Sequence, residues 1–175
     1  SVEDAALMLS AMAGYDPADQ SSSRLPIDEY TEFNKYGKHP PNIGVVRDFF
    51  YQHAQDEIQS HTELTIKRLQ EAGATIKEVK LPASFEIHEA ARNVVFNVEV
   101  ATFHQEMFAK NPESYGPLLR RVIETGSLIP GIHYVQAQRI RRQFRTDMET
   151  LLSGVDVLLT PATISAAPRD RTTTG

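Results

Sequence analysis

The sequence predicts an α/β fold in which a mixed, mainly parallel sheet is packed with helices. A strand, an amphipathic helix and a second strand follow one another over residues 42–81, which is the pattern of a βαβ unit. Further along, Val155–Thr160 is an almost continuous apolar run, typical of a strand covered on both faces of a parallel sheet. With 175 residues, of which 41% are hydrophobic, the chain can form one substantial core.

The N-terminal part begins with a predicted helix and continues as a long irregular stretch. In Ser1–Ala13 the apolar residues recur at helical spacing after a capping box, and Gly14 follows the last turn. The stretch 15–41 is rich in Pro, Ser and charged residues, so we expect a long surface excursion with one helical turn around Ile27–Phe33. Residues 1–175 are expected to form a single α/β domain or a fragment of a larger domain.

The βαβ unit consists of three predicted elements. Asn42–Arg47 is a short buried strand, and Ala74–Leu81 is a second strand that ends at Pro82. Between them, Gln52–Ala72 has acidic residues near its start and basic residues near its end, as the helix dipole favours. Because a helix connects the two strands, we expect them to be parallel.

Two interpretations compete for the segment Ser84–Phe108. Its apolar residues recur at helical spacing, whereas the alternation and composition around Val94–Phe103 favour a strand. No glycine or proline interrupts the segment, and we therefore expect a helix.

The last part of the chain is predicted to contain two helices and a strand. Tyr115–Thr125 is a short helix ended by Gly126, and Pro130–Ser153 is a long helix that precedes the strand Val155–Thr160. The stripe of the long helix that is expected to face the core comprises Tyr134, Ala137, the stem of Arg141, Phe144, Met148 and Leu151.

Composition and charge exclude several classes of function. The net charge of −5 argues against a direct nucleic-acid interface, which needs a basic face. Without cysteine the chain has no disulfide, thiolate metal site or cysteine nucleophile. The sequence shows neither an apolar run of membrane-spanning length nor a signal peptide, so we expect a cytoplasmic protein without membrane contact. The six histidines match no metal-ligand motif, and we expect no metal or cofactor.

Two clusters of polar residues are better explained as surface features than as sites. Ser21–Ser23 lacks the glycine-flanked turn and the nearby base that a serine nucleophile needs. Acidic residues directly follow the arginines of the long helix, so we interpret this helix face as solvated or ion-paired. These arginines are Arg139, Arg141, Arg142 and Arg145.

Two other features are candidates for a binding site. Arg120 and Arg121 lie in a mostly apolar helix, so one of them should point inward and need a partner. A structural ion pair and a substrate carboxylate or carbonyl are both open as that partner. Thr160 and Pro161 follow the last buried strand, and ligands of open α/β sheets bind beyond the carboxyl ends of the strands.

Taken in order, several segments resemble the amidase signature family. They are SVEDAALML (Ser1–Leu9), AGYDPAD (Ala13–Asp19), NIGVVRDFF (Asn42–Phe50), LQEAGATIKEVKLP (Leu69–Pro82), YVQAQRIRR (Tyr134–Arg142) and DVLLTPATISAAP (Asp156–Pro168). Each segment is a weak signal by itself, but their common order across almost the whole chain makes the resemblance specific.

The resemblance implies hydrolysis or transfer of the amide nitrogen of small amides by a serine, a second serine on a cis peptide and a lysine. No position of this chain matches those residues, so no catalytic residue is assigned, and the chain alone is expected to be inactive. Arg121 is similar to the arginine that contacts the substrate in glutamine-using members, and Thr160 and Pro161 resemble a wall of the pocket. These three are the expected substrate-binding residues.

The parent protein implied by the resemblance is a hydrolase of carbon–nitrogen bonds that binds a small-molecule amide. It is either a free amidase or an amidotransferase A-type subunit. Both ends of the chain look cut, so we expect a fragment of a larger amidase domain that exposes apolar surface and self-associates as a homo-oligomer. The alternative is a stand-alone, non-catalytic α/β binding or interaction module.

Overall fold

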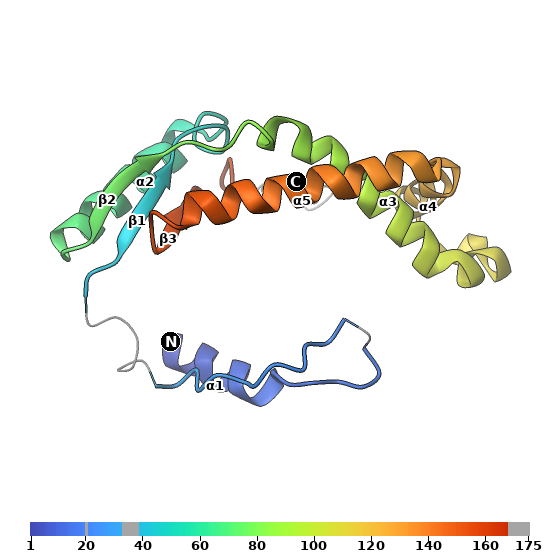
Figure 1. The fold of residues 1–175 in the computed structure, drawn as a ribbon, viewed down its shortest axis with the longest axis horizontal. Coiled ribbons are helices and arrows are strands. Elements are labelled where there is room, and N and C mark those ends of the chain that lie inside the picture. Colours follow the sequence, from blue (N-terminus) through green and yellow to red (C-terminus); the bar gives the residue numbers. More distant parts are fainter. Residues whose placement is uncertain (20, 33–38, 168–175) are drawn as a thin grey trace. The chain divides into compact units, whose positions relative to one another are not determined.

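A computed structural model describes residues 1–19, 21–32 and 39–167 of the chain (Figure 1). Contacts between residues divide the chain into two compact units, Ser1–Pro41 and Asn42–Gly175. The second unit contains the sheet and the pockets described below.

The first unit is built around the helix α1 (Val2–Met12). The predicted capping box is present, because the Asp4 N–H donates to Ser1 Oγ at 3.2 Å and the Asp4 carboxylate accepts in return. The sequence predicts a helical turn around Ile27–Phe33. The described residues of this range form a single hydrogen-bonded turn and no helix. Phe33 lies outside the described residues.

Three parallel strands form the sheet of the second unit. They are β1 (Asn42–Val46), β2 (Thr75–Val79) and β3 (Val157–Leu159), in the order β2-β1-β3. The register pairs Ile43 of β1 with Ile76 on one side and with Val157 on the other. The α/β fold class is confirmed, as is the prediction that these strands share one sheet with the first two parallel.

β1 is the buried centre of the sheet, whereas β3 is partly open. Val45 and Val46 are each 1% exposed. Gly44 lets the neighbouring strand approach closely, since a Cβ at this position would lie 2.8 Å from Leu158 Cδ2. In β3, however, Val157 is 48% exposed. One face of β3 is therefore open in the described part of the chain, contrary to the two-sided cover that its apolar sequence predicts.

The helix α2 (Asp56–Glu71) connects β1 to β2 and contacts the sheet. It begins later than the predicted start at Gln52. The reason is local, because the Gln59 side-chain amide donates to the carbonyl oxygens of Tyr51 and Ala54 at 3.1 and 3.0 Å. These bonds hold the residues before α2 in a turn.

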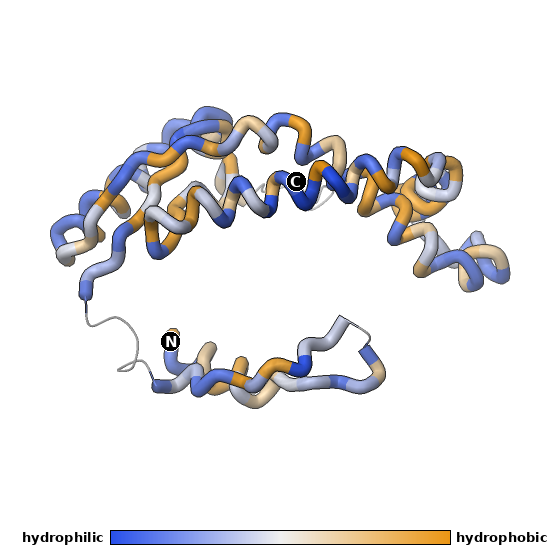
Figure 2. The backbone as a smooth tube through the Cα atoms, in the orientation of Figure 1, coloured by the Kyte–Doolittle hydropathy of each residue, from blue (hydrophilic) through white to orange (hydrophobic). Residues whose placement is uncertain are grey.

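Three α-helices follow β2 and pack together as a layer. They are α3 (Phe85–Lys110), α4 (Pro117–Leu128) and α5 (Gly131–Leu152), with the 3₁₀ turn η2 (Pro112–Ser114) between the first two. α3 is unbroken, so the helical interpretation of this segment is confirmed. Ala91 and Val95 of α3 pack with Ala137 of α5, and polar and apolar residues alternate along α5 (Figure 2).

Two details predicted for the helical layer are wrong. Gly126 lies inside α4 rather than at its end. A Cβ at Gly126 would collide with the Asn97 carbonyl oxygen and lie 2.8 Å from Ala101 Cβ, so this glycine allows α4 to approach α3 closely. The stem of Arg141 is not in the buried stripe, because Arg141 is exposed and Ile140 packs against the core instead.

Candidate functional site

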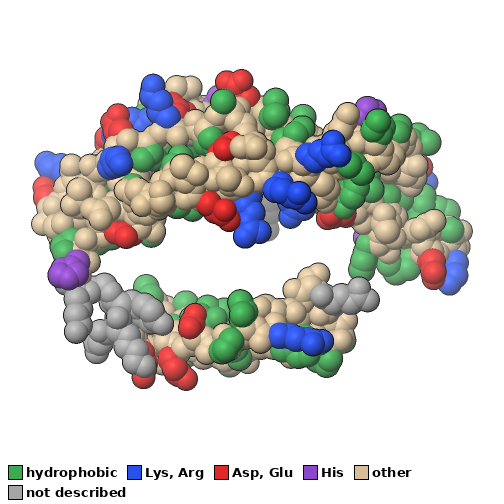
Figure 3. All heavy atoms as spheres, in the orientation of Figure 1, with side chains coloured by type: hydrophobic (Ala, Val, Ile, Leu, Met, Phe, Trp, Pro, Cys, Tyr) green, Lys and Arg blue, Asp and Glu red, His purple; other side chains and the backbone are tan. Residues whose placement is uncertain are grey.

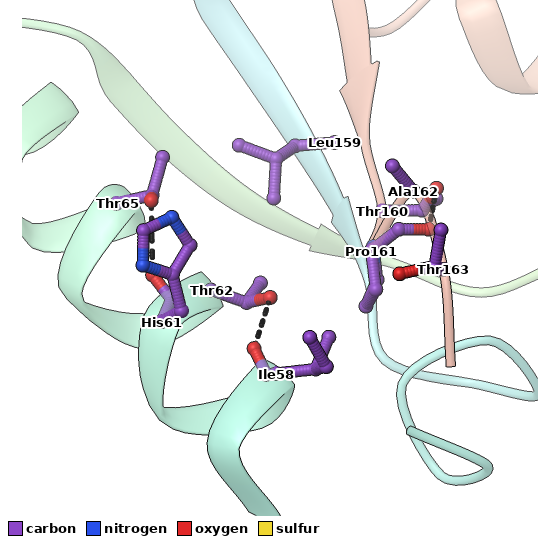
Figure 4. A pocket seen from close by; sticks show the side chains of 9 residues that line it. All are labelled: Ile58, His61, Thr62, Thr65, Leu159, Thr160, Pro161, Ala162 and Thr163. Atoms are coloured by element: carbon purple, nitrogen blue, oxygen red, sulfur yellow. Dashed lines mark hydrogen bonds between the residues drawn. The ribbon is translucent and has the colours of Figure 1, made fainter. Parts of the chain in front are cut away.

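A pocket opens at the carboxyl end of β3, where the sequence predicts a ligand site (Figure 4). Its volume is about 270 Å³. The lining residues are Ile58, His61, Thr62, Thr65, Leu159, Thr160, Pro161, Ala162 and Thr163. α2 forms one side of the pocket, and β3 with the segment that follows it forms the other.

Hydrogen bonds between distant segments fix both sides of this pocket. The Gln55 N–H, just before α2, donates to Ile164 O at 2.8 Å and ties the segment after β3 to the helix. Before β3, the Asp156 N–H donates to Asn42 O at 2.8 Å, and Asp156 Oδ2 accepts from the Asn42 N–H at 2.7 Å. Because the latter bond joins residues 114 positions apart, the geometry of the pocket depends on the tertiary fold.

The hydroxyl groups of Thr62, Thr65 and Thr163 in the pocket donate to backbone carbonyls but can still accept hydrogen bonds. Thr62 Oγ1 donates to Ile58 O at 2.8 Å, and Thr65 Oγ1 donates to His61 O at 2.9 Å (Figure 4). Thr163 Oγ1 donates to a backbone carbonyl of its own segment at 2.8 Å. A hydroxyl has one proton and two lone pairs, so each of these oxygens remains an acceptor for a ligand N–H.

The pocket is electrically neutral apart from one imidazole. Its lining, among the described residues, contains no Asp, Glu, Lys or Arg. The ring of His61 forms no hydrogen bond within the described part of the chain, and the residue is exposed. The arrangement is suited to binding an uncharged group, because a buried charge without a partner is costly.

A polar cluster beside β1 holds α2 against the sheet. Two N–H groups of the Arg47 guanidinium donate to the two carboxylate oxygens of Glu63, and its Nε–H donates to Glu78 Oε1 at 2.8 Å. The Tyr51 hydroxyl donates to Glu63 Oε1 at 2.6 Å, and its ring centroid lies 5.1 Å from Arg47 Cζ. Glu63 is adjacent to Thr62, so this cluster fixes the turn of α2 that lines the pocket.

The cluster shifts the ionisation of its members. Hydrogen bonds from Arg47 and Tyr51 hold the pKa of Glu63 below its usual value. The bond to Glu63 in turn raises the pKa of the Tyr51 hydroxyl and of the Arg47 guanidinium. At neutral pH the cluster is therefore an ionised arginine–carboxylate pair with a neutral phenol. The sequence does not reveal it, because its members come from the connection before α2, from α2 and from β2, with no common spacing.

A second pocket surrounds the paired arginines of α4. Its volume is about 350 Å³, and it is lined by Tyr115, Pro117, Arg120, Arg121 and Glu124. Arg120 is the inward arginine that the sequence predicts: it is half-buried, and its Nη2 donates to Pro112 O at 2.6 Å. Its buried Nε has no partner among the described residues, whereas Arg121 is exposed. The partner found is thus a backbone carbonyl rather than a carboxylate.

The structure does not bring the three predicted substrate-binding residues together. Thr160 and Pro161 line the pocket beside α2, whereas Arg121 lines the pocket at α4, and the two pockets share no residue. Only the structure shows that residues of α2 line a pocket together with the segment after β3.

The remaining candidates lie outside both pockets. Arg145 pairs with Glu149 at 2.8 Å, and Lys and Arg side chains lie over α5 on the face shown in Figure 3. Ser22 Oγ accepts from the Asp16 N–H at 2.8 Å within a surface turn. In residues 1–19, 21–32 and 39–167, no group of His, Asp or Glu is arranged to hold a metal ion. None of the helices in this described part combines the length and apolar character needed to cross a membrane.

A parallel sheet with a helical crossover and a small pocket at its carboxyl edge defines an α/β protein suited to small ligands. The family model described as Amidase matches residues 1–175, and the chain belongs to this family. The resemblance to the amidase signature family is thereby confirmed. The alternative of a stand-alone, non-catalytic α/β binding or interaction module is not favoured.

Amidases and amidotransferase subunits are among the known relatives of this chain. An amidase from Pseudomonas putida is 33% identical over 160 residues, covering 91% of this chain and 34% of the relative. The A-type subunit of the glutamyl-tRNA(Gln) amidotransferase from Microcystis aeruginosa (strain NIES-843 / IAM M-2473) is 31% identical over 188 residues, covering 95% of this chain and 39% of the relative.

A similar solved structure belongs to an inhibitor-bound vestigial protein complex that reveals the evolutionary origins of an s-triazine catabolic enzyme. Its TM-score is 0.83 at 31% identity, over 98% of this chain and 36% of the solved chain. The chain described here therefore spans between a third and two fifths of the length of these relatives.

Proposed function

We propose that the protein containing this chain is an amidase-type hydrolase of carbon–nitrogen bonds. In this proposal the chain supplies scaffold and substrate-facing segments, and the serines and lysine of the reaction lie elsewhere in the protein. The observation that carries the proposal is the pocket at the carboxyl end of β3, in a chain that belongs to the amidase family. Thr160 and Pro161 would form the wall that the substrate contacts.

Arg121 is proposed as a contact for those substrates that carry an anionic group. Its exposed guanidinium fork matches the geometry of a carboxylate. A simple apolar amide carries no such group, so this contact would matter only for amides that also carry a carboxylate, such as glutamine.

The proposal also concerns the substrate, the cellular location and the association of the protein. It includes a small-molecule amide as substrate, a cytoplasmic location, no direct contact with nucleic acid, and self-association. Self-association is supported by β3, an edge strand of the described sheet with an exposed apolar residue at Val157. Sedimentation velocity of the 175-residue chain over a concentration series should show species larger than the monomer. A monomer at every concentration would contradict the proposed self-association.

Amide hydrolysis tests the main proposal. A polypeptide that carries this chain within the full length of its relatives should release ammonia from small amides, and the chain alone should release none. In the longer polypeptide, Thr160→Arg should lower kcat/KM at least about tenfold, because it places a charge and bulk in the pocket wall. Thr125→Arg, at an exposed position of α4 that lines neither pocket, is the matched control. Absence of hydrolysis by the longer polypeptide would refute the proposal.

A further inference from the structure

A third pocket lies beside the turn that follows β1. Its volume is about 270 Å³. The turn after β1, the segment after β2 and the start of α3 line it, and it shares no residue with the pocket beside α2 or with the pocket at α4. This cavity is called the aromatic pocket, and the proposed function leaves it without a role.

Phenylalanine rings form an apolar wall of the aromatic pocket. The rings of Phe49 and Phe85 lie in edge contact with their centroids 5.1 Å apart, and the Phe49 ring centroid is 4.7 Å from that of His53. Phe49 has a φ of 43°, in the left-handed region that residues other than glycine rarely adopt, yet it stays 41% exposed. Burial of the ring therefore does not account for the strained conformation, which indicates a role in binding. The electron-rich faces of such rings attract cations.

The charges that line the aromatic pocket are negative. They belong to Asp48 and Glu86, and the described lining contains no Lys or Arg. Neither carboxylate forms an ion pair within the described part of the chain. Glu86 lies in the first turn of α3 and offsets the positive end of the helix dipole, so the charge of Asp48 is left for a ligand. A cation in this pocket meets opposite charge, whereas an anion does not.

The hydrogen bonds already made in the aromatic pocket leave acceptors for a ligand. His53 Nδ1 lies 2.6 Å from Phe49 O, and a carbonyl oxygen only accepts, so Nδ1 carries the proton. The neutral imidazole therefore keeps a lone pair on Nε2. Asp48 Oδ2 accepts from the Leu81 N–H at 3.2 Å, which leaves Asp48 Oδ1 as a free acceptor.

Few N–H donors remain for an anionic ligand. The backbone N–H groups of Phe85 and Glu86 donate to carbonyl oxygens of the segment just before α3, at 2.9 and 3.3 Å. Gln52 has side-chain N–H groups without a partner in the described part of the chain, but its amide offers an oxygen acceptor as well. The aromatic pocket thus suits a ligand that is positively charged and donates hydrogen bonds.

We propose that the aromatic pocket binds the primary ammonium group of a small alkylamine. The three N–H groups of an alkylammonium match in number the acceptors on Asp48, His53 and Glu86. Its charge and its alkyl chain can both contact the phenylalanine rings. The alkyl chain should be short, because the pocket is smaller than the roughly 300–1,000 Å³ that is usual for drug-sized ligands. The inference goes beyond the proposed function, since it concerns another pocket and another class of ligand.

Methyl NMR of the 175-residue chain tests the inference. The reporters are the ¹³C-labelled methyl groups of Leu81 and Ala83, which line the aromatic pocket. Leu128 in α4 and Ala109 in α3 line none of the three pockets and serve as internal references. The chain is titrated at constant ionic strength with butylamine, with 1-butanol and with butyrate at pH 8, where the amine is charged and an imidazole is uncharged.

Butylammonium should shift both reporters and leave the references unchanged, and 1-butanol and butyrate should bind at least about fivefold more weakly. 1-Butanol has nearly the shape of butylammonium, so a difference between these two ligands reports the positive charge. Butyrate reports the sign of the charge. Equal binding of 1-butanol or of butyrate would overturn the inference, as would the absence of any shift with butylammonium.

An aspartate variant shows whether the charge of the aromatic pocket binds the amine. Asp48→Asn keeps an acceptor for the Leu81 N–H but removes the charge, and it should weaken butylammonium binding at least about threefold. Asp28→Asn changes the net charge equally at an exposed position that lines none of the three pockets, and it should leave binding unchanged.

A second pair of variants tests the aromatic wall. Phe49→Leu removes a ring of the pocket and should also weaken butylammonium binding, whereas Phe103→Leu, at an exposed position of α3 outside the lining, should not. Reference methyl signals at their native positions show that each variant is folded. Butylammonium binding that is unchanged in either Asp48→Asn or Phe49→Leu would refute the inference.

Discussion

The sheet with α2 and the layer of α3, α4 and α5 are held together by different forces. In the sheet region, directional polar bonds join distant segments, as between Arg47 and Glu63 and between Asn42 and Asp156. In the helical layer, small residues allow close contact of the helices, as at Gly126. Directional bonds fix the position of polar atoms around a pocket, whereas close packing of helices mainly limits the volume left between them. In the sheet region, the hydrogen bonds of Gln55 and Asp156 accordingly hold both sides of the pocket beside α2 in place.

The largest effect is expected when the close packing is broken. Gly126→Ala should lower the free energy of unfolding by about 3 kcal/mol, because the added Cβ meets backbone atoms of α3 that cannot move aside. Gly131→Ala is the matched control, since a Cβ at Gly131 meets nothing within 4 Å and should change stability by less than about 0.5 kcal/mol. Urea unfolding followed by circular dichroism measures both. Equal stabilities of the two variants would contradict the packing argument.

A smaller effect is expected when the polar cluster of the sheet region is broken. Glu63→Ala should lower the free energy of unfolding by about 1–2 kcal/mol, because Arg47 and Tyr51 both lose their acceptor. Water compensates part of the loss, since the side chains of Arg47 and Glu63 are 34% and 43% exposed.

The exposed pair of Arg145 and Glu149 in α5 supplies the control for this prediction. Glu149→Ala should change stability by no more than about 0.5 kcal/mol. In methyl NMR spectra, Glu63→Ala should also move the signal of Thr62, which Glu149→Ala should leave in place. An unperturbed Thr62 signal in Glu63→Ala would show that the cluster does not fix the pocket.

The smallest effect is the dependence of this cluster on pH. The pKa of Glu63 is lower in the folded chain than in the unfolded chain, where a glutamate has a pKa of about 4.3. Its stabilising contribution is therefore complete above that value and is lost as the pH falls through the folded-state pKa. The difference in unfolding free energy between the native chain and Glu63→Gln should shrink between pH 6 and pH 3. A constant difference over this range would contradict the assignment.

Much of the fold follows from local sequence patterns. The apolar run of β1, the dipole-matched charges of α2 and the stop at Pro82 are sufficient to predict the βαβ unit. The uninterrupted segment of α3 was enough to decide between a helix and a strand. Gly126 misled the prediction, because glycine after an apolar run indicates a helix end, and only the contact with Asn97 shows its actual role.

The candidate site was less accessible to sequence analysis. Thr160 and Pro161 could be located by their position after a strand, but the opposite wall on α2 depends on the bond between Gln55 and Ile164. Arg120 and Arg121 could be singled out together, but their sequence context does not determine which one points inward. That choice is made by the carbonyl of η2, which no periodicity reveals.

In the proposed function, the pocket between α2 and the segment after β3 receives the substrate of an amide hydrolase. Steady-state kinetics of the longer polypeptide with butyramide test this role in two variants, Ala162→Leu inside the pocket lining and Ala166→Leu outside it. Ala162→Leu should raise KM at least about tenfold, while Ala166→Leu should retain the native kcat/KM. If the two variants have the same KM as the native protein, this pocket does not receive the substrate.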